Sequence, residues 1–285
     1  MARAERRGQA HGGVGCLAGL AGATITLASG PIWISGKSVT VDALAAPGIT
    51  LQGAGDRLLI VDPGAAGVVR GLTFANGFGW TLGGAMIING RAELDHVVVR
   101  NNTAMTDAPD WWKGGGGIYV GDDATLVLRD SSVRDNAASL ANGAPGECNG
   151  GGIFATWRSN VTIERSTISG NSAANVGGGI RFVGNASIVD STISGNVTQG
   201  WNGSAIFLTD GVVSVVNSSI VHNTVPADQG LGALFVGTFG DGSASLSGAN
   251  SIVAENAGGV GCFLAPWGAG AVTLTSLGSN VVGDG

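Results

Sequence analysis

The chain has 285 residues, a formal net charge of −6 at neutral pH, and 52 glycines beside only 7 prolines. Lysine and arginine form no cluster beyond Arg3, Arg6 and Arg7, which argues against a nucleic-acid partner, because such binding depends on clustered positive charge. The mean hydropathy is +0.30, yet no apolar stretch reaches the roughly 18 residues that a transmembrane helix needs, so no transmembrane segment is expected. Abundant glycine with little proline excludes a collagen-like chain and indicates tight turns with closely stacked backbone.

The N-terminal segment differs from the rest of the chain. Its arginines precede a short apolar stretch at 14–23, an order typical of export signals, although glycines interrupt the stretch. We therefore predict two parts. Residues 1–22 are an N-terminal segment, either a signal remnant or a cap, and residues 23–285 are one repetitive domain.

A glycine-rich anchor followed by an aliphatic residue recurs through this domain at intervals of 26 to 35 residues. The anchors lie at 83–86, 115–118, 150–153, 177–180 and 203–206, with a weaker copy at 232–234. Each anchor leads into two further stretches in which apolar and polar residues alternate. Such alternation predicts short β-strands, and no stretch has the 3.6-residue period of a helix.

The last stretch of each repeat has a constant length. An aliphatic residue precedes Asn by eight positions in five successive repeats, as from Leu94 to Asn102 and from Ile163 to Asn171. Strands this short cannot bury a face alone, so the repeats must stack on one another. The sequence therefore predicts an all-β fold, a single-stranded right-handed parallel β-helix of about eight rungs, each with three short strands.

A column of asparagines is expected at one corner of this solenoid. Asn tolerates the left-handed backbone of a sharp turn, and its amide can donate to a carbonyl of the next rung, which predicts an internal Asn ladder. The residues assigned to the ladder are Asn76, Asn102, Asn136, Asn171, Asn196, Asn223, Asn256 and Asn280.

Two motifs point to a known family. Gly-Gly-Gly-Ile and Ser-Thr-Ile-Ser-Gly-Asn, the latter at 166–171 and 191–196, resemble the right-handed parallel β-helix repeats of secreted and surface bacterial proteins, including polymorphic outer-membrane proteins. The resemblance extends over residues 23–285 and implies an extracellular or cell-surface location. It implies no single activity, because the same architecture carries polysaccharide lyases, glycoside hydrolases, esterases, adhesins and passive stalks.

Charged residues on the body of the solenoid fall into columns with alternating sign. One column holds Asp95, Arg129 and Glu164, and the next holds His96, Asp130, Arg165, Asp190 and Asn217. Because adjacent strands lie about 4.8 Å apart, opposite charges one above the other attract. These columns predict ion pairs between rungs rather than an active site.

Cysteines and metal ligands offer few candidates for chemistry. Cys16, Cys148 and Cys262 fall near the start, middle and end of the stack, too far apart for a disulfide, so Cys148 is expected to be a free thiol or a buried small residue. No metal site or cofactor is predicted, since the histidines lack partners at ligand spacing. Calcium at the turns Asp122-Asp123 or Asp241-Gly242 is an alternative to ordinary turn chemistry.

Two adjacent repeats carry long insertions between the corner Asn and the next anchor, at 103–113 and 137–149. Insertions in a solenoid mark its functional edge. Tryptophan rings cover the apolar face of a sugar and carboxylates accept its hydroxyls, so these loops predict carbohydrate contact, although the rings can instead cover the flank of the solenoid. The predicted ligand-binding residues are Trp80, Trp111, Trp112, Lys113, Trp201 and Asp228.

Three functions remain open from the sequence. The favoured one is a protein that binds polysaccharide or a surface partner through these loops. A carbohydrate-active enzyme, hydrolase or lyase, is an alternative in which Asp107, Asp110 and Glu147 supply the carboxyl groups that glycoside hydrolysis requires. A passive structural or adhesin stalk that self-associates through its open ends is the other alternative.

Overall fold

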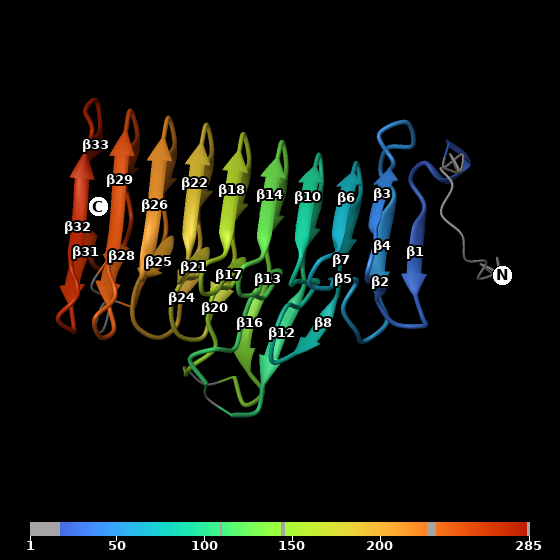
Figure 1. Cartoon of the computed structure of the whole chain (residues 1–285), viewed down its shortest axis with the longest axis horizontal. Helices are drawn as coiled ribbons and strands as arrows, with labels where there is room; N and C mark the ends of the chain where they lie inside the picture. Colours follow the sequence, from blue (N-terminus) through green and yellow to red (C-terminus); the bar gives the residue numbers. More distant parts are fainter. Residues whose placement is uncertain (1–17, 109, 144–145, 227–231, 284–285) are drawn as a thin grey trace.

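The computed structural model describes residues 18–283 except 109, 144–145 and 227–231. The chain winds as a stack of similar coils, and every strand pairs in parallel with the equivalent strand of the next coil (Figure 1). The predicted right-handed parallel β-helix is confirmed. A single 3₁₀ turn, η1 (Ala18–Leu20), precedes the first strand. Within the described residues, no helix has the length and apolar character to cross a bilayer.

Three sheets run the length of the stack, and we name them A, B and C. Sheet A contains β1 (Thr24–Leu27), β4 (Thr50–Gly53), β7 (Thr73–Ala75), β11 (Val98–Arg100), β15 (Ser132–Arg134), β19 (Thr167–Ser169), β23 (Thr192–Ser194), β27 (Ser219–Val221), β30 (Ile252–Ala254) and β33 (Val281–Val282). Sheet B contains β2 (Ile32–Ile34), β5 (Leu59–Val61), β9 (Met86–Ile88), β13 (Ile118–Val120), β17 (Ile153–Ala155), β21 (Ile180–Phe182), β25 (Ile206–Thr209), β28 (Gly232–Thr238) and β31 (Val260–Pro266). Sheet C contains β3 (Ser38–Asp42), β6 (Ala66–Arg70), β10 (Arg91–Asp95), β14 (Thr125–Arg129), β18 (Asn160–Glu164), β22 (Asn185–Val189), β26 (Gly211–Val216), β29 (Ala244–Ala249) and β32 (Val272–Ser276).

A fourth, shorter sheet was not expected. Sheet D contains β8 (Phe78–Trp80), β12 (Thr103–Thr106), β16 (Ala137–Leu140), β20 (Ser172–Ala173) and β24 (Val197–Thr198). The prediction of three strands per rung therefore holds outside these five rungs, where the chain adds one more strand after the corner Asn. Both long insertions begin as strands of this sheet, which extends away from the body in Figure 1.

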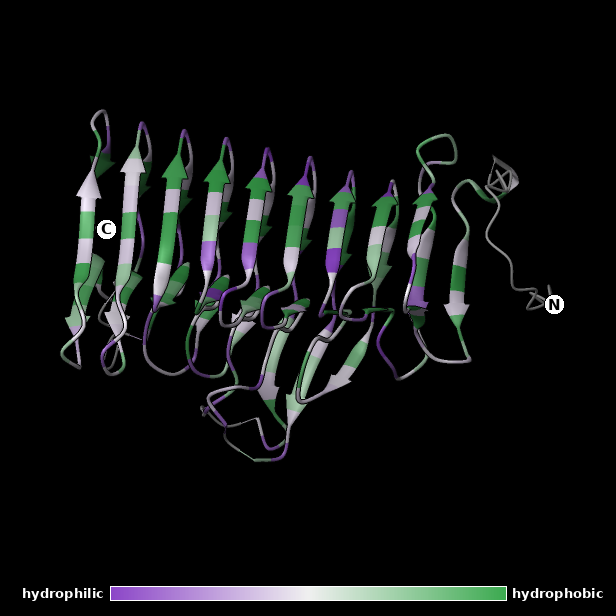
Figure 2. Ribbon diagram, viewed as in Figure 1, coloured by the Kyte–Doolittle hydropathy of each residue, from purple (hydrophilic) through white to green (hydrophobic). Residues whose placement is uncertain are grey.

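The core lies inside the coil and follows directly from the alternation. Leu94, Leu128, Ile163 and Ile188 occupy the same register position on successive strands of sheet C, and all four are fully buried. Apolar and polar bands alternate along the strands in Figure 2. Stacking identical positions buries a continuous apolar column, which is the main stabilising term of a solenoid.

The Asn ladder is present, with a corrected membership. From Asn136 onward, each ladder Asn side chain accepts hydrogen bonds from the backbone N–H and the Nδ2 of the Asn one rung before it, as Asn171 does from Asn136 at 3.0 and 2.9 Å. The ladder runs through Asn102, Asn136, Asn171, Asn196, Asn223 and Asn256. Asn76 stands one position earlier, and Gly77 instead donates to Asn102.

The left-handed backbone also lies elsewhere than expected. The ladder asparagines are absent from the positive-φ residues, whereas the residue before each has φ between 55° and 64°, as in Asn101, Asp135 and Gly170. Asn76, with φ of 55°, belongs to this preceding column. The ladder position therefore requires the hydrogen-bonding side-chain amide of Asn, and the residue before it adopts the left-handed backbone of the turn.

A second ladder of hydroxyl groups lies at the next corner. Ser131, Ser166, Ser191, Ser218 and Ser251 are buried, and each Oγ accepts the backbone N–H of the equivalent residue one rung before it. Asn280 accepts from the N–H of Ser251 at 2.8 Å. Asn280 thus ends the serine ladder rather than the Asn ladder, which corrects its assignment.

The glycine anchors are explained by close approach between rungs. A Cβ on Gly151 would lie 2.3 Å from the Ser172 carbonyl oxygen and 2.4 Å from that of Gly178. A Cβ at Gly151 would therefore collide with the neighbouring backbone, which explains the glycine there, whereas the anchor at 203–206 accommodates Ser204 and Ala205 at the equivalent positions.

The charged columns form the predicted ion pairs. Asp95 lies opposite Arg129, which lies opposite Glu164. Arg129 Nε is 2.8 Å from Glu164, and both guanidinium nitrogens of the Arg165 fork are 2.8 Å from the two oxygens of Asp130. The pKa of Asp130 is lowered because its carboxylate accepts these hydrogen bonds.

Cys148 is a buried thiol in no disulfide, as expected, and Cys16 lies outside the described residues. Burial raises the pKa of Cys148 to about 12, because an apolar environment disfavours the thiolate.

Candidate functional site

The outer face of sheet B is unusual because it is largely aromatic and, from Phe154 to Phe235, buried. One register column on this face passes through all nine strands. Its residues are Trp33, Ile60, Ile87, Tyr119, Phe154, Arg181, Phe207, Phe235 and Phe263. Phe207 and Phe235 stack with ring centroids 4.4 Å apart, and Phe235 also stacks on Trp267 at 4.9 Å. A solenoid face that is normally exposed is therefore covered here.

The insertion at 103–113 supplies part of this cover. Trp111 packs beside the cluster formed by Val176, Phe207, Phe235 and Ala265. Its ring centroid lies 5.6 Å from that of Phe239, which follows β28. Since Trp111 precedes β13, the insertion leans over the strands of four following rungs.

Arg181 is the charged member of this aromatic column, and its side chain is almost entirely buried, at 1% exposure. Its guanidinium carbon lies 4.7 Å from the Phe154 ring centroid, 5.3 Å from that of Trp111 and 5.4 Å from that of Trp112. Nη1 donates a hydrogen bond to the backbone carbonyl of Trp111. Arg181 thereby fixes both tryptophans of the insertion through cation–π contact and one hydrogen bond.

Burial lowers the pKa of Arg181 to about 9, an effect that the nearby carboxylates of Glu147 and Asp110 partly oppose. The guanidinium therefore stays charged at neutral pH. Its Nε is buried and has no hydrogen-bond partner among the described residues. A buried donor left unsatisfied costs about 1–3 kcal/mol, which a ligand acceptor would recover.

A cavity of about 420 Å³ opens beside this cluster. Its walls are aromatic, with charged groups at Arg181 and Asp210. The lining residues are Trp111, Trp112, Trp157, Arg181, Val183, Trp201, Thr209, Asp210 and Phe239, and we name this cavity the aromatic pocket. Trp112 and Trp157 lie with centroids 5.5 Å apart, and Trp201 lies 6.0 Å from Trp267.

Asp210 is the acceptor of the aromatic pocket. Its Oδ1 is buried without a hydrogen-bond partner among the described residues, and desolvation raises the pKa of its carboxyl group. The pocket therefore combines flat rings, an unsatisfied donor and an unsatisfied acceptor. This set can hold a ligand that has an apolar face and hydroxyl groups at its edge.

The residues predicted to bind ligand divide into two groups. Trp111, Trp112 and Trp201 line the aromatic pocket. Trp80 does not; its carbonyl accepts from Arg57, and its ring packs on Phe78. Lys113 points its ammonium toward the hydroxyl of Thr106 at 3.2 Å rather than into the pocket. Asp228 lies outside the described residues.

The three predicted catalytic carboxylates do not line the aromatic pocket. Asp110 and Glu147 are joined by their backbones, since the Asp110 N–H donates to the Glu147 carbonyl at 3.1 Å, and both act electrostatically on Arg181. Asp110 Oδ1 accepts the N–H of Trp112 at 2.9 Å. Asp107 is exposed. A catalytic role for these residues stays a prediction.

Sequence reasoning missed Trp157, Arg181, Asp210 and Phe239. A signal was available for Arg181. The residue that follows the aliphatic anchor is aromatic in four rungs, Tyr119, Phe154, Phe207 and Phe235, and is arginine at 181. A charged residue that replaces an aromatic one within a repeat indicates a specific role.

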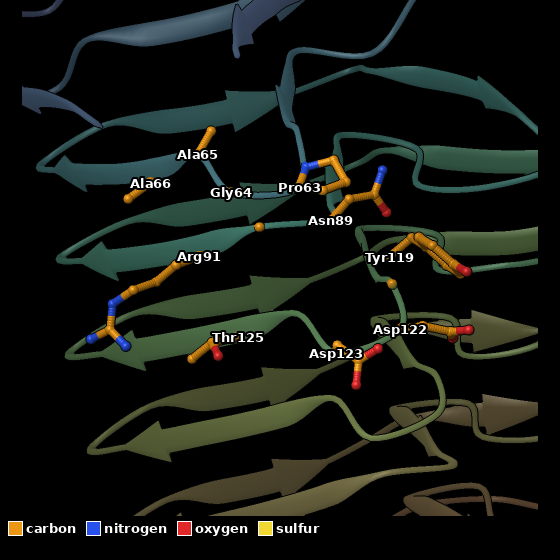
Figure 3. A pocket seen from close by; sticks show the side chains of 12 residues that line it. Pro63, Gly64, Ala65, Ala66, Asn89, Arg91, Tyr119, Asp122, Asp123 and Thr125 are labelled. Atoms are coloured by element: carbon orange, nitrogen blue, oxygen red, sulfur yellow. The ribbon is translucent and has the colours of Figure 1, made fainter. Parts of the chain in front are cut away.

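A second hollow of about 760 Å³ lies over neighbouring rungs and is shown in Figure 3. Its labelled residues include Asn89, Arg91, Tyr119, Asp122 and Asp123. Both oxygens of Asp123 accept from the Arg158 guanidinium at 2.7 Å, and Asp122 Oδ1 accepts from the Thr156 hydroxyl at 2.7 Å. Calcium binding at these two carboxylates stays a prediction.

One possible set of metal ligands was also found among the described residues. Oxygen and nitrogen atoms of Asp95, His96 and Asp130 lie within 4.8 Å of one another. Arg165 occupies both oxygens of Asp130, and His96 Nδ1 lies 2.7 Å from Asp95. The group is part of the ion-pair columns.

A comparison with protein families supports the fold. A family model described as a right handed beta helix region matches residues 33–273. No curated protein and no solved structure matches the chain.

Proposed function

The chain belongs to the right-handed β-helix family, and from that premise we propose that it binds carbohydrate in the aromatic pocket. One observation carries the proposal: four tryptophans and a phenylalanine surround a cavity of about 420 Å³ that also presents Arg181 and Asp210. Flat rings stack on the apolar face of a pyranose, while a guanidinium and a carboxylate bind its hydroxyl groups. The proposal includes an extracellular or cell-surface location, where polysaccharides are encountered.

Substitution of Trp157 or Trp201 by alanine tests the proposal. Both side chains are partly exposed and line the pocket. We expect each change to weaken glycan binding about tenfold, equivalent to about 1.4 kcal/mol. Isothermal titration calorimetry against a panel of glycans measures the loss.

Trp33→Ala is the matched control. Trp33 is 61% exposed and lies in the same register column, on β2, outside the pocket. We expect its affinity to equal that of the unmodified protein. Trp80→Ala separates the pocket from the wider loop edge in the same way. An unmodified protein that binds no glycan of the panel would contradict the proposal.

Cleavage of a glycan is a second candidate, favoured by one observation. Asp210 has a raised pKa in an aromatic environment, the property of a general acid in glycoside hydrolysis. The reaction needs a second carboxylate, for which Asp110 and Glu147 are the candidates; both act electrostatically on Arg181, although neither lines the pocket. Release of reducing sugar that disappears in Asp210→Asn would support this reaction, and equal release by the variant would contradict it.

A further inference from the structure

We infer that the aromatic pocket is one end of a longer groove, which holds an extended, uncharged polysaccharide chain along the solenoid axis. The second hollow, around Tyr119, is the other end. The inference rests on the proposed function and deepens it, because it names the form and the charge of the ligand.

The two hollows occupy one continuous column of turns. Seven successive connections from sheet B to sheet C each contribute a lining residue to one hollow or the other. These residues are Gly64, Gly90 and Asp122 in the second hollow, followed by Trp157, Val183, Asp210 and Phe239 in the aromatic pocket. With about 4.8 Å between rungs, the first and last turns are about 29 Å apart. A ligand that follows this column is a chain of several sugar units.

The hollows meet at one direct contact between lining residues. The backbone N–H of Asp123, in the second hollow, donates to the carbonyl of Trp157, in the pocket, at 3.0 Å. On the neighbouring strands of sheet B, the rings of Tyr119 and Phe154 meet edge to face with centroids 5.7 Å apart. The Arg181 guanidinium lies over the Phe154 ring. The pair Asp123 and Arg158 forms the boundary between the hollows.

The second hollow offers the groups that a sugar chain requires. Figure 3 shows Asn89 from one rung and Tyr119 and Asp122 from the next on one side of the hollow, with Arg91 and Thr125 on the other. The carboxamide, phenol, carboxylate and guanidinium can exchange hydrogen bonds with hydroxyls. Tyr119 also presents a ring, which fits the apolar face of a pyranose.

The charge along the groove favours an uncharged chain over a polyanion. Arg158 balances Asp123 in a bidentate pair, Arg91 and Asp122 both line the second hollow, and Arg181 and Asp210 both line the aromatic pocket. A polyanion would meet no excess of positive charge there, because Glu93 lies 3.9 Å from Arg91, and Glu147 and Asp110 act electrostatically on Arg181. The unsatisfied Nε of the nearly buried Arg181 still needs an acceptor, which a neutral hydroxyl supplies.

Calorimetry with a ladder of neutral oligosaccharides, from disaccharide to octasaccharide, tests the inference with the full chain. We expect affinity to rise with each added unit until the groove is filled, and to change little with salt because no charge is neutralised. An oligouronate ladder and a chitosan ladder are run beside it. Tighter binding of either charged ladder would overturn the assignment of an uncharged ligand.

Two variants separate the inference from the proposed function. Tyr119→Phe and Arg91→Ala change the second hollow without removing a core residue, and we expect each to reduce affinity for the long oligomers about fivefold while the disaccharide is unaffected. Trp157→Ala is expected to weaken the binding of both the long oligomers and the disaccharide. If long and short oligomers bind equally and neither variant matters, the groove is wrong and the pocket stands. If no ladder binds even to the unmodified protein, the proposed function fails with it.

Discussion

Arg181 shows how one residue converts a repeat into a site. In a column otherwise made of aromatic and aliphatic side chains, it is a planar cation that three rings surround and one backbone carbonyl binds. The register of sheet B fixes the position of Arg181 on β21. Arg181 therefore holds the insertion at 103–113 against strands that come later in the chain.

Arg181→Lys should test this clamp. Lysine keeps the charge but lacks the planar fork that stacks and donates in several directions. We expect a loss of about 2 kcal/mol in stability and faster amide exchange at 103–113, with the solenoid strands unaffected. Hydrogen exchange followed by mass spectrometry measures both. Arg158→Lys, on an exposed ion pair, is the control, and exchange at 103–113 that matches in the two variants would contradict the clamp.

The raised pKa of Asp210 predicts how the stability of the protein depends on pH. Because burial raises its pKa in the folded state, the native protein binds this proton more tightly than the unfolded chain does. The resulting stability is fully present below the unfolded pKa of about 3.9, and it is lost as pH rises through the raised value. Asp210→Asn has no such loss. The variant should therefore gain thermal stability over the unmodified protein as pH increases from 4 to 7, and a difference that stays constant with pH would contradict the assignment.

At the scale of the elements, the two ladders explain why the corners of the solenoid are uniform. Asn171 accepts from Asn136 and donates to the Val133 carbonyl and to Asn196, all of them buried. A break in this chain leaves several buried groups without partners, which costs more than the loss of an average hydrogen bond.

Asn171→Ala should therefore destabilise the protein by about 2–4 kcal/mol. Chemical denaturation monitored by far-ultraviolet circular dichroism measures the change. Asn160→Ala replaces an exposed asparagine on β18 and is expected to cost well under 1 kcal/mol. Equal costs for the two variants would show that the ladder adds nothing.

The ladders also show what a sequence repeat can and cannot predict. A spacing of eight residues correctly grouped Asn102, Asn136 and Asn171, because equal spacing from an inward aliphatic residue places each at the same corner. At the ends of the stack the repeat is degenerate. Asn76 and Asn280 share the residue type but not the position, and only the hydrogen bonds distinguish them.

The aromatic pocket lies beyond such reasoning for a physical reason. The alternation of each strand determines which side chains point outward, but it does not determine where a long insertion comes to rest. Trp111 contacts Phe239 and Arg181 across 128 and 70 residues of sequence. The residue type alone was enough to predict that the tryptophans of the insertion bind ligand. The residues that they contact depend on how far the insertion extends along the solenoid axis, which the sequence pattern does not determine.

At the scale of the whole molecule, the strands farthest from the N-terminus expose apolar side chains. Leu277, Val281 and Val282 are 58–64% exposed, and β31, β32 and β33 pair on one side only among the described residues. An open edge of parallel strands is a template for another chain. End-to-end self-association remains a prediction, with this edge as its surface.

Static light scattering tests it. We expect the weight-average mass to rise with concentration and Val281→Lys to restore a monomer, because a buried charge opposes strand addition. Val212→Lys is the control, since Val212 is similarly exposed, at 56%, on the side of sheet C. A concentration-independent monomer would contradict self-association.

The grouping of tryptophans has an optical consequence. Five of the seven, Trp111, Trp112, Trp157, Trp201 and Trp267, line the aromatic pocket or touch a ring that does, so most of the tryptophans of the chain lie in one place. Trp112 and Trp157 are close enough, and tilted enough at 39°, for their electronic transitions to couple. The near-ultraviolet dichroism and emission of this protein therefore report on the pocket without any added label.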